Sequence, residues 1–272
     1  MLLVAPNPDV AAADEHYGAR HGGHVAGRAD RERIARAIAG YRTAAREKSN
    51  AEARWKLARA LYFQATYTGL EGPERTAGLE DARRVSEEAL AILAERAEGR
   101  GAPGLARMPP QGKARALRAD PDAGPAFFWA AVAWGEWALA VGKLKAARTG
   151  AAGRLRDYAE TVIAIDPDLE EGGGHRILGR LHHQAPRIPL VTGWVSRAEG
   201  LRHLRRAVDA HPRNFVNRLF LAEALADGST AERAEAIRMA RALAAESPSA
   251  DYLVEELRIQ RAARRNLAAW TR

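Results

Sequence analysis

The sequence predicts an all-α fold, and two observations support that prediction. Hydrophobic residues make up 47% of the chain but aromatic residues only 6%, so alanine and leucine must build most of the core. Alanine has the highest helix propensity, whereas strands favour β-branched and aromatic side chains. The second observation is a helix–loop–helix pattern over residues 170–223, in which Pro212 ends the second helix. We therefore expect closely packed helical hairpins, with about ten to twelve helices in all.

The hairpin pattern is typical of tetratricopeptide repeats. Leu178 and Gly179 lie in the middle of one expected helix, and Ala207 lies late in the next. Such a repeat is about 34 residues long. Here the spacings are 45 and 36 residues between the prolines that end successive hairpins, Pro167, Pro212 and Pro248. The sequence thus predicts degenerate tetratricopeptide-like hairpins, stacked into a compact solenoid or bundle, in a single domain over residues 9–272.

Prolines, glycines and caps divide the N-terminal part of the chain. Pro6 and Pro8 predict a flexible arm over residues 1–8. Gly27 ends the first helix, and Asp30 is a candidate N-cap for the second. A loop is expected over residues 69–78 because of its glycines. Helices are expected over about residues 9–26, 30–48, 50–67 and 79–98.

Residues 99–125 form an expected irregular insertion. They contain ten glycines and prolines, with a short helix expected over residues 111–119. Long loops inside compact domains are usually functional or disordered. A functional lid and a plain insertion are both consistent with this composition.

The next helix, residues 125–141, is apolar all round, which predicts a central and buried position. Glu136 is its only charged residue and shares a stripe with Trp129 and Val132. A lone buried carboxylate is unfavourable unless it is paired. Two interpretations follow: an ion pair with a neighbouring arginine, or a ligand cavity that Trp129 and Trp137 wall.

The C-terminal half continues the array. Ser229 or Thr230 is expected to cap one helix, and Gly150 and Gly153 to loosen another. The last helix would seal the exposed end of the stack, as terminal caps do in repeat proteins. Helices are expected over about residues 144–165, 170–186, 197–212, 214–226, 229–246 and 250–269.

Charge and cysteine content limit the classes of function. The chain has 42 basic and 34 acidic residues, a formal charge of +8, and the two signs are interleaved. This distribution favours arginine-rich helix surfaces paired with acids over a nucleic-acid surface. The absence of cysteine excludes disulfides, thiolate nucleophiles and thiolate metal sites. No apolar run approaches the roughly 20 residues of a membrane span.

The polar residues match no catalytic or metal-binding motif. The chain has no Gly-x-Ser-x-Gly elbow, and no motif places a pair of carboxylates. His175 and His182 are seven residues apart, whereas two-histidine metal sites on a helix use a four-residue spacing. The glycines at 172–174 lack the preceding strand of a dinucleotide-binding loop. We therefore expect no enzyme activity, no cofactor and no metal.

The stretch after Pro167 resembles the T-component family of tripartite ATP-independent periplasmic (TRAP) transporters, whose hairpins are tetratricopeptide-like. The similarity covers about residues 52–245. The aromatic helix around Trp129 is similar to the family's middle helix. The motif residues that carry the resemblance are Gly174, Leu178, Gly179, Arg180, Pro186, Asn217 and Glu223.

The resemblance implies a non-enzymatic accessory protein, periplasmic or envelope-associated, that binds the transporter's substrate-binding protein and encloses a small ligand. The chain departs from the family in having no lipid-anchor cysteine, and residues 191–195 replace a glycine–aspartate turn. Its apolar start, residues 1–5, is too short for a complete signal peptide and is read as the stub of one. A cytoplasmic location is the alternative.

The expected ligand site is a central cavity. Trp129, Val132 and Glu136 would wall it, with His175 and Arg176 nearby. The Arg176 guanidinium would orient an acid through a bidentate contact. One alternative is a general cytoplasmic scaffold that holds a partner peptide in a repeat groove. Another is an enzyme, whose mark would be a strongly perturbed acid–base pair. A homo-oligomer is compatible with these interpretations, and no nucleic-acid partner is expected.

Overall fold

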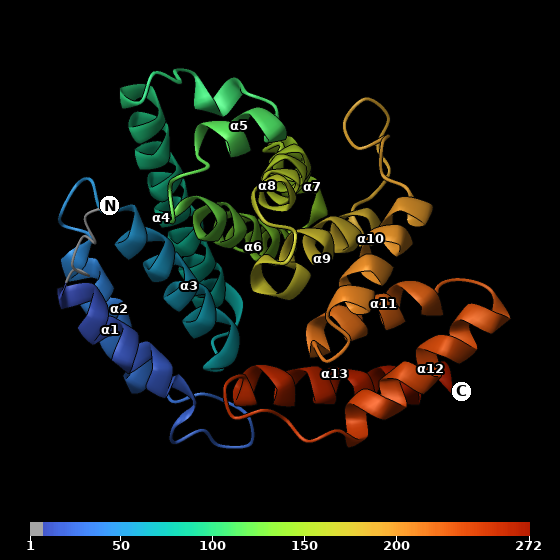
Figure 1. Cartoon of the computed structure of the whole chain (residues 1–272). Helices are drawn as coiled ribbons and strands as arrows, with labels where there is room; N and C mark the ends of the chain where they lie inside the picture. Colours follow the sequence, from blue (N-terminus) through green and yellow to red (C-terminus); the bar gives the residue numbers. More distant parts are fainter. Residues whose placement is uncertain (1–7) are drawn as a thin grey trace. The chain divides into compact units, whose positions relative to one another are not determined.

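The chain is all-α, as the sequence predicts. In a computed structural model that describes residues 8–272, thirteen α-helices and two short 3₁₀ helices account for the regular structure (Figure 1). Within these residues the only extended pairing is an isolated bridge between Val25 and Arg28. None of the described helices has the length and hydropathy that a membrane span requires.

The contacts divide the chain into two compact units, residues 1–141 and 142–272. The single-domain organisation expected over residues 9–272 stays a prediction. The expected flexible arm, residues 1–8, lies outside the described residues except for Pro8, which opens the first helix.

In the first unit each helix packs on a neighbour along the chain. α3 and α4 form the most extensive pair, and α6 packs on both of them. Asp30 is the N-cap of α2, as predicted, and its carboxylate accepts a hydrogen bond from the amide of Glu32. The elements are α1 (Pro8–Gly18), η1 (Ala19–His21), α2 (Arg31–Ala44), α3 (Ala51–Tyr67), α4 (Gly72–Gly99), η2 (Leu105–Arg107), α5 (Pro110–Ala116) and α6 (Ala123–Val141).

Two expected boundaries in this unit are wrong. The expected loop at 69–78 is helical from Gly72 onward, because Pro73 lies in the first turn, where its missing N–H is no loss. Gly78 is then a packing residue, since a Cβ there would lie 3.2 Å from the Cβ of Ala65 on α3. The first helix is shorter than expected, because a 3₁₀ turn and Gly22 follow Gly18.

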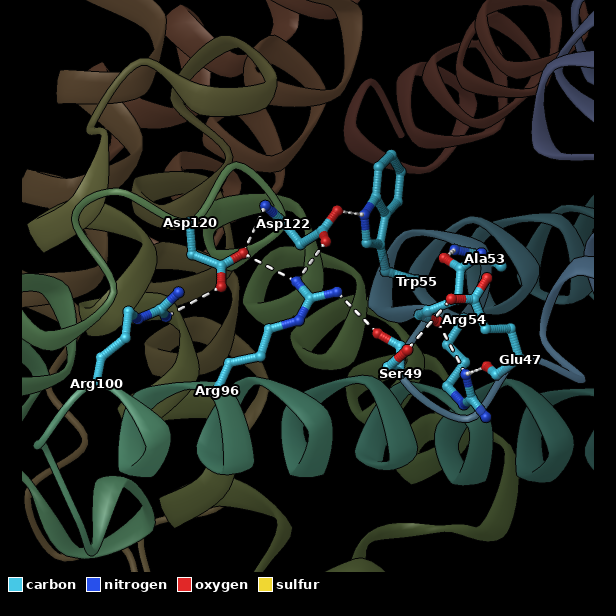
Figure 2. A network of polar contacts seen from close by, with 10 residues as sticks. Glu47, Ser49, Ala53, Arg54, Trp55, Arg96, Arg100, Asp120 and Asp122 are labelled. Carbon is cyan, nitrogen blue, oxygen red and sulfur yellow. Dashed lines mark hydrogen bonds and ion pairs between the residues drawn. The ribbon is translucent and has the colours of Figure 1, made fainter. Parts of the chain in front are cut away.

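The insertion is fastened to the helical core by a polar network (Figure 2). Arg96 on α4 donates to Asp120 at 3.2 Å, to Asp122 at 2.8 Å and to the carbonyl of Ser49 at 2.8 Å. Asp122 also accepts from the indole Nε1 of Trp55 at 3.1 Å, and Asp120 accepts from Arg100 at 3.1 Å. The network joins the end of the insertion to α3 and α4, so the chain enters α6 from a fixed position.

The second unit is a sequential array of helices. α9 packs on α10 and α11 on α12, while α11 also contacts α9 and α13. The expected helix at 144–165 is two helices, because Gly150 adopts a left-handed conformation with φ +71°. Ser229 forms a capping box with Glu232 at the start of α12. The elements are α7 (Lys143–Arg148), α8 (Ala151–Ile165), α9 (Leu169–Gln184), α10 (Arg197–Ala210), α11 (Phe215–Ala226), α12 (Thr230–Ala245) and α13 (Leu253–Trp270).

The last helix packs on the hairpin before it. Ala263 of α13 lies in one apolar cluster with Phe215, Leu219 and Leu243, and Trp270 packs against both this cluster and its neighbour. The buried amide of Gln260 donates to the carbonyl of Leu243 at 3.1 Å. Helix α13 therefore covers α11 and α12, as a terminal capping helix does.

Candidate functional site

Glycines bring the helices of the second unit into close contact. A Cβ at Gly174 would lie 2.7 Å from the Ile163 side chain on α8, and one at Gly179 would overlap Leu204 on α10. A Cβ at Gly200 would lie 3.1 Å from the Cβ of His182. Gly174 and Gly179 of the expected motif therefore serve packing, and Leu178 beside them is buried.

Arg176 holds the irregular start of α9. Glu170 and Glu171 have left-handed φ values of 51° and 55°, a conformation that is unfavourable for side chains with a Cβ. The Arg176 guanidinium donates to the Glu170 carbonyl at 3.1 Å and to the Asn217 side chain at 2.9 Å. Asn217, itself fully buried, donates to the carbonyls of Glu171 and Ala207. One nitrogen of the Arg176 guanidinium thus donates to acceptors within the chain, and these hydrogen bonds stabilise the strained turn at Glu170 and Glu171.

A row of polar contacts joins α9 to α11. Arg180 pairs with Glu223, and Nε2 of His183 lies 2.9 Å from the Asp227 carboxylate. Together with the Arg176–Asn217 contact, these pairs have residue numbers that increase along both helices. The helices α9 and α11 therefore run parallel. The second oxygen of Glu223 accepts from Asn266 on α13 at 3.0 Å. We call Arg180, Glu223 and Asn266 the polar row.

The polar row is accessible from solvent. The side chains of Arg180 and Glu223 are 26% and 21% exposed to solvent, so this pair is neither buried nor freely solvated. The Arg180 guanidinium lies over the Phe220 ring at 4.2 Å, which supplies a cation–π contact. The face that α9, α11 and α13 share therefore presents a guanidinium, a carboxylate, an amide and part of an aromatic ring together.

A second group of polar residues, the histidine cluster, lies between α9 and α10. It consists of His175, His182 and His203. The Nδ1 atoms of His175 and His203 are 2.8 Å apart, and the rings of His182 and His203 stack at 6.3 Å. His175 is 5% exposed and His203 9%, so their hydrogen bonds are formed out of water.

The donors around the cluster determine where its protons lie. Arg202 donates to Nε2 of His203 at 3.2 Å, since a guanidinium has no acceptor. A neutral His203 must then carry its proton on Nδ1 and donate it to Nδ1 of His175. His175 in turn carries its proton on Nε2, a buried atom that has no hydrogen-bond partner among the described residues.

Burial keeps the cluster neutral at pH 7. It lowers the pKa of His175 to about 4, and the nearby Arg206 and Arg202 add to the shift. Burial likewise lowers the pKa of His203 to about 4, again with help from Arg202. Burial also lowers the pKa of His182, which the charge of Glu199 partly opposes. A cluster of neutral imidazoles can accept protons only under acidic conditions.

The other expected ligand residues lie in the first unit. Glu136 pairs with Arg75 on α4 at 2.9 Å, in agreement with the ion-pair interpretation. The Trp129 ring packs on Tyr62 at 5.9 Å, and its buried Nε1 has no acceptor among the described residues. Val132 on the same stripe is half-buried. These three residues and the pair His175 and Arg176 belong to different units, so the five-residue ligand site stays a prediction.

The sequence did not lead us to place His203 or Trp194 in a site. The seven-residue spacing of His175 and His182 places both on one face of α9, but their partners depend on the register of α10 after a loop of unpredictable length. Pro186 of the expected motif begins that loop, and Thr192 within it is buried. In the described part of the chain, no group of three or more histidines or carboxylates is arranged to hold a metal ion.

Two comparisons with known proteins gave no match. A scan against protein-family models and a search of the curated proteins both returned no match for this chain.

Proposed function

We propose that the chain is a non-catalytic binding module that holds a protein partner on the face of α9, α11 and α13. The polar row supports the proposal. It lies where parallel first helices of successive hairpins form a shared surface, the surface that helical-repeat proteins use for binding.

The chemistry of this face suits a polypeptide. A guanidinium binds carboxylates and backbone carbonyls, and the Glu223 and Asn266 side chains supply an acceptor and a donor for backbone amides. The Phe220 ring under Arg180 is only partly buried, so its exposed part offers a contact surface for an apolar side chain of the partner. The face therefore matches a partner segment with alternating polar and apolar groups.

Site-specific photo-crosslinking tests the proposal. A benzophenone side chain at Phe220 on α11 should give a discrete protein adduct in cells, and Arg180→Ala should reduce it. The matched control places the same side chain at Met239 on α12, which is also partly buried in the same apolar cluster. A second control is Arg205→Ala, which removes an arginine that pairs with Glu235 between α10 and α12. Equal adducts at both positions, or none at Phe220, would refute the proposed face.

The partner's identity separates two forms of this proposal. In the first, the chain acts as an accessory T-component of a TRAP-type transporter, in the periplasm or at the envelope, and the adduct contains a substrate-binding protein. In the second, the chain is a general cytoplasmic scaffold with a different partner. Mass spectrometry of the adduct distinguishes them directly, because a transporter's binding protein is recognisable from its peptides.

The second part of the proposal is that the chain binds a small ligand, and the environment of Trp129 supports it. Its indole N–H is buried without an acceptor among residues 8–272, and such donors are rare unless water or a ligand satisfies them. Native mass spectrometry of the purified chain should reveal a retained molecule that Trp129→Phe loses, since phenylalanine keeps an aromatic ring but no donor. Trp55→Phe is the control, because that indole already donates to Asp122. Retention by Trp129→Phe would exclude this donor as the anchor.

A further inference from the structure

The loop between α9 and α10, residues 185–196, is ordered from within. The buried Thr192 hydroxyl donates to the Pro186 carbonyl and accepts from the Ile188 amide at 2.9 Å. The tip that this arrangement holds out is apolar and exposed. Leu190 is fully solvent-exposed in a left-handed conformation of φ +64°, and Val191 beside it is half exposed. The left-handed backbone and the exposed apolar side chain of Leu190 both cost free energy, so other contacts must hold the loop in this conformation.

Its attachment passes through the histidine cluster. The amide of Ser196 donates to Nδ1 of His182 at 3.0 Å, and the Trp194 ring meets the His182 ring edge-on at 5.4 Å. Arg156 of α8 lies over the same indole at 4.9 Å. Ser196 is also the N-cap of α10, where it accepts from the amide of Glu199. The end of the loop and the start of α10 are therefore held by one neutral imidazole nitrogen.

An added proton has no acceptable position in this arrangement. Nδ1 of His182 faces an amide N–H, and Nε2 of His203 faces a guanidinium N–H. Nδ1 of His175 already receives the only proton that His203 can donate. Protonating any of these nitrogens places a donor against a donor, and a buried donor without an acceptor is strongly unfavourable.

The surrounding charges do not compensate. From α8, Arg156 and Glu160 face the cluster and pair with each other at 2.7 Å. The charged groups of α10 that act on the cluster are Arg202 and Arg206, with Glu199 already paired to Arg202. Asp168, before α9, contacts Nε2 of His211 at 3.1 Å. Each carboxylate near the cluster thus has another cationic or imidazole partner, and three arginines add positive potential.

We propose that the histidine cluster is a proton-sensitive latch: neutral imidazoles hold the 185–196 loop on α9 and α10, and acidification releases its Ser196 end. This inference is independent of the proposed binding function. The released state frees Trp194 and the apolar tip from their anchor and removes the cap of α10.

The pH window follows from linkage. In the released state His182 titrates near its ordinary pKa of about 6.5, whereas burial lowers that pKa in the latched state. The released state therefore binds more protons below about pH 6.5, and release becomes favoured by up to about tenfold per pH unit for one proton. Above about pH 7 all three imidazoles are neutral in both states, and the latch is closed.

Amide exchange of the full-length chain at different pH values tests the latch. After correction for the intrinsic exchange rate, protection of the Ser196 amide should fall between pH 7 and pH 5, by at most about tenfold per pH unit. The internal control is the Asn217 amide, which donates to Asn214 rather than to a histidine and should lose less protection than the Ser196 amide.

His182→Asn is the decisive variant. The asparagine carbonyl oxygen occupies nearly the position of Nδ1, so it still accepts from the Ser196 amide but does not titrate. Protection at pH 7 should persist and the pH dependence should disappear. His183→Asn is the matched control, because this neighbouring histidine contacts Asp227 and not the loop, and its profile should follow the wild type.

Two results would overturn the latch. One is a corrected Ser196 protection that does not change between pH 7 and pH 5 in the wild type. The other is a His182→Asn profile identical to the wild type. If the variant fails to fold, the nitrogen chemical shifts of the wild-type histidines decide: protonation of all three clustered imidazoles at or above pH 6.5 contradicts the proposal, whereas neutral imidazoles there support it.

Discussion

The buried imidazoles of His175 and His203 make the stability of the second unit depend on pH. Both have a pKa lowered to about 4 in the folded chain, against an ordinary value of 6.5. The unfolded state therefore binds more protons as pH falls from about 6.5 to about 4, and the free energy of unfolding decreases over that window. Below about pH 4 both states are protonated, and this contribution changes no further.

We expect acidification from pH 7 to pH 5 to reduce the free energy of unfolding by about 2 kcal/mol for each of these histidines. Urea titrations at the two pH values measure it. His203→Gln should be less stable at pH 7 but lose less on acidification. His16→Gln removes an exposed histidine and should leave the pH difference unchanged; a smaller pH difference in that variant would locate the effect elsewhere.

Two glycines give opposite predictions for the same substitution. Gly179→Ala places a methyl group against Leu204, so we expect a loss of about 1–3 kcal/mol. Gly153→Ala on α8 meets no atom within 4 Å and should add about 0.5–1 kcal/mol through helix propensity. Urea denaturation of the two variants beside the wild type measures both. Equal effects would mean that the α9–α10 contact is looser than described.

At the scale of elements, the insertion depends on Arg96. Its pKa is raised above the ordinary value, because the hydrogen bonds and charges of Asp122 and Asp120 outweigh the opposing effect of burial. The carboxylate of Asp120 is almost fully buried, so it needs its cationic partners. The insertion is thus held by these charged contacts in addition to the buried side chains of Leu105 and Leu117.

Arg96→Gln should loosen residues 99–122 and lower the free energy of unfolding by on the order of 2 kcal/mol, because Arg100 is then the one cationic partner of Asp120 among the described residues. Limited proteolysis should cut within the insertion faster than in the wild type. Arg84→Gln is the comparison, since that arginine forms exposed pairs on the same helix and should change stability by less than about 0.5 kcal/mol. Unchanged cleavage of Arg96→Gln would argue against this fastening.

Sequence patterns predict the elements better than their partners. Asp30 and Ser229 mark helix starts locally, so their caps were predictable. The loop prediction over residues 69–78 was wrong at Gly78, because a glycine in a helix that serves close packing looks the same in sequence as one in a turn. The motif residues Arg180 and Glu223 pair across 43 positions of sequence. Over that separation, residue spacing does not predict which side chains of two helices meet.

At the scale of the whole chain, charge is unevenly distributed. Residues 142–272 contain 22 basic and 16 acidic residues, a net charge of +6, which leaves +2 for residues 1–141. The bond of His175 with His203 and the polar row both lie in the more basic unit. A protein partner of this unit would therefore associate faster if it were acidic, and added salt would slow that association.

The second unit should fold without the first. Two apolar clusters are built from residues of this unit, from Leu204 to Trp270, and each of its described helices has a packing partner within the unit. We expect the fragment 142–272 to be helical by circular dichroism and to unfold cooperatively in urea. A fragment without a cooperative transition would show that its stability depends on residues 1–141.

The sequential packing of α8 to α13 has a consequence for synthesis. Since each helix packs mainly on the next one made, α9 can pair with α10, and α11 with α12, soon after each leaves the ribosome. The apolar face of Leu219 and Leu243 is different, because part of its cover is α13, which is made after both of them. At roughly 5–20 residues per second, that face waits for its cover for one to a few seconds. The nascent chain is thus most open to a chaperone, or to aggregation, in the interval before α13 has been made.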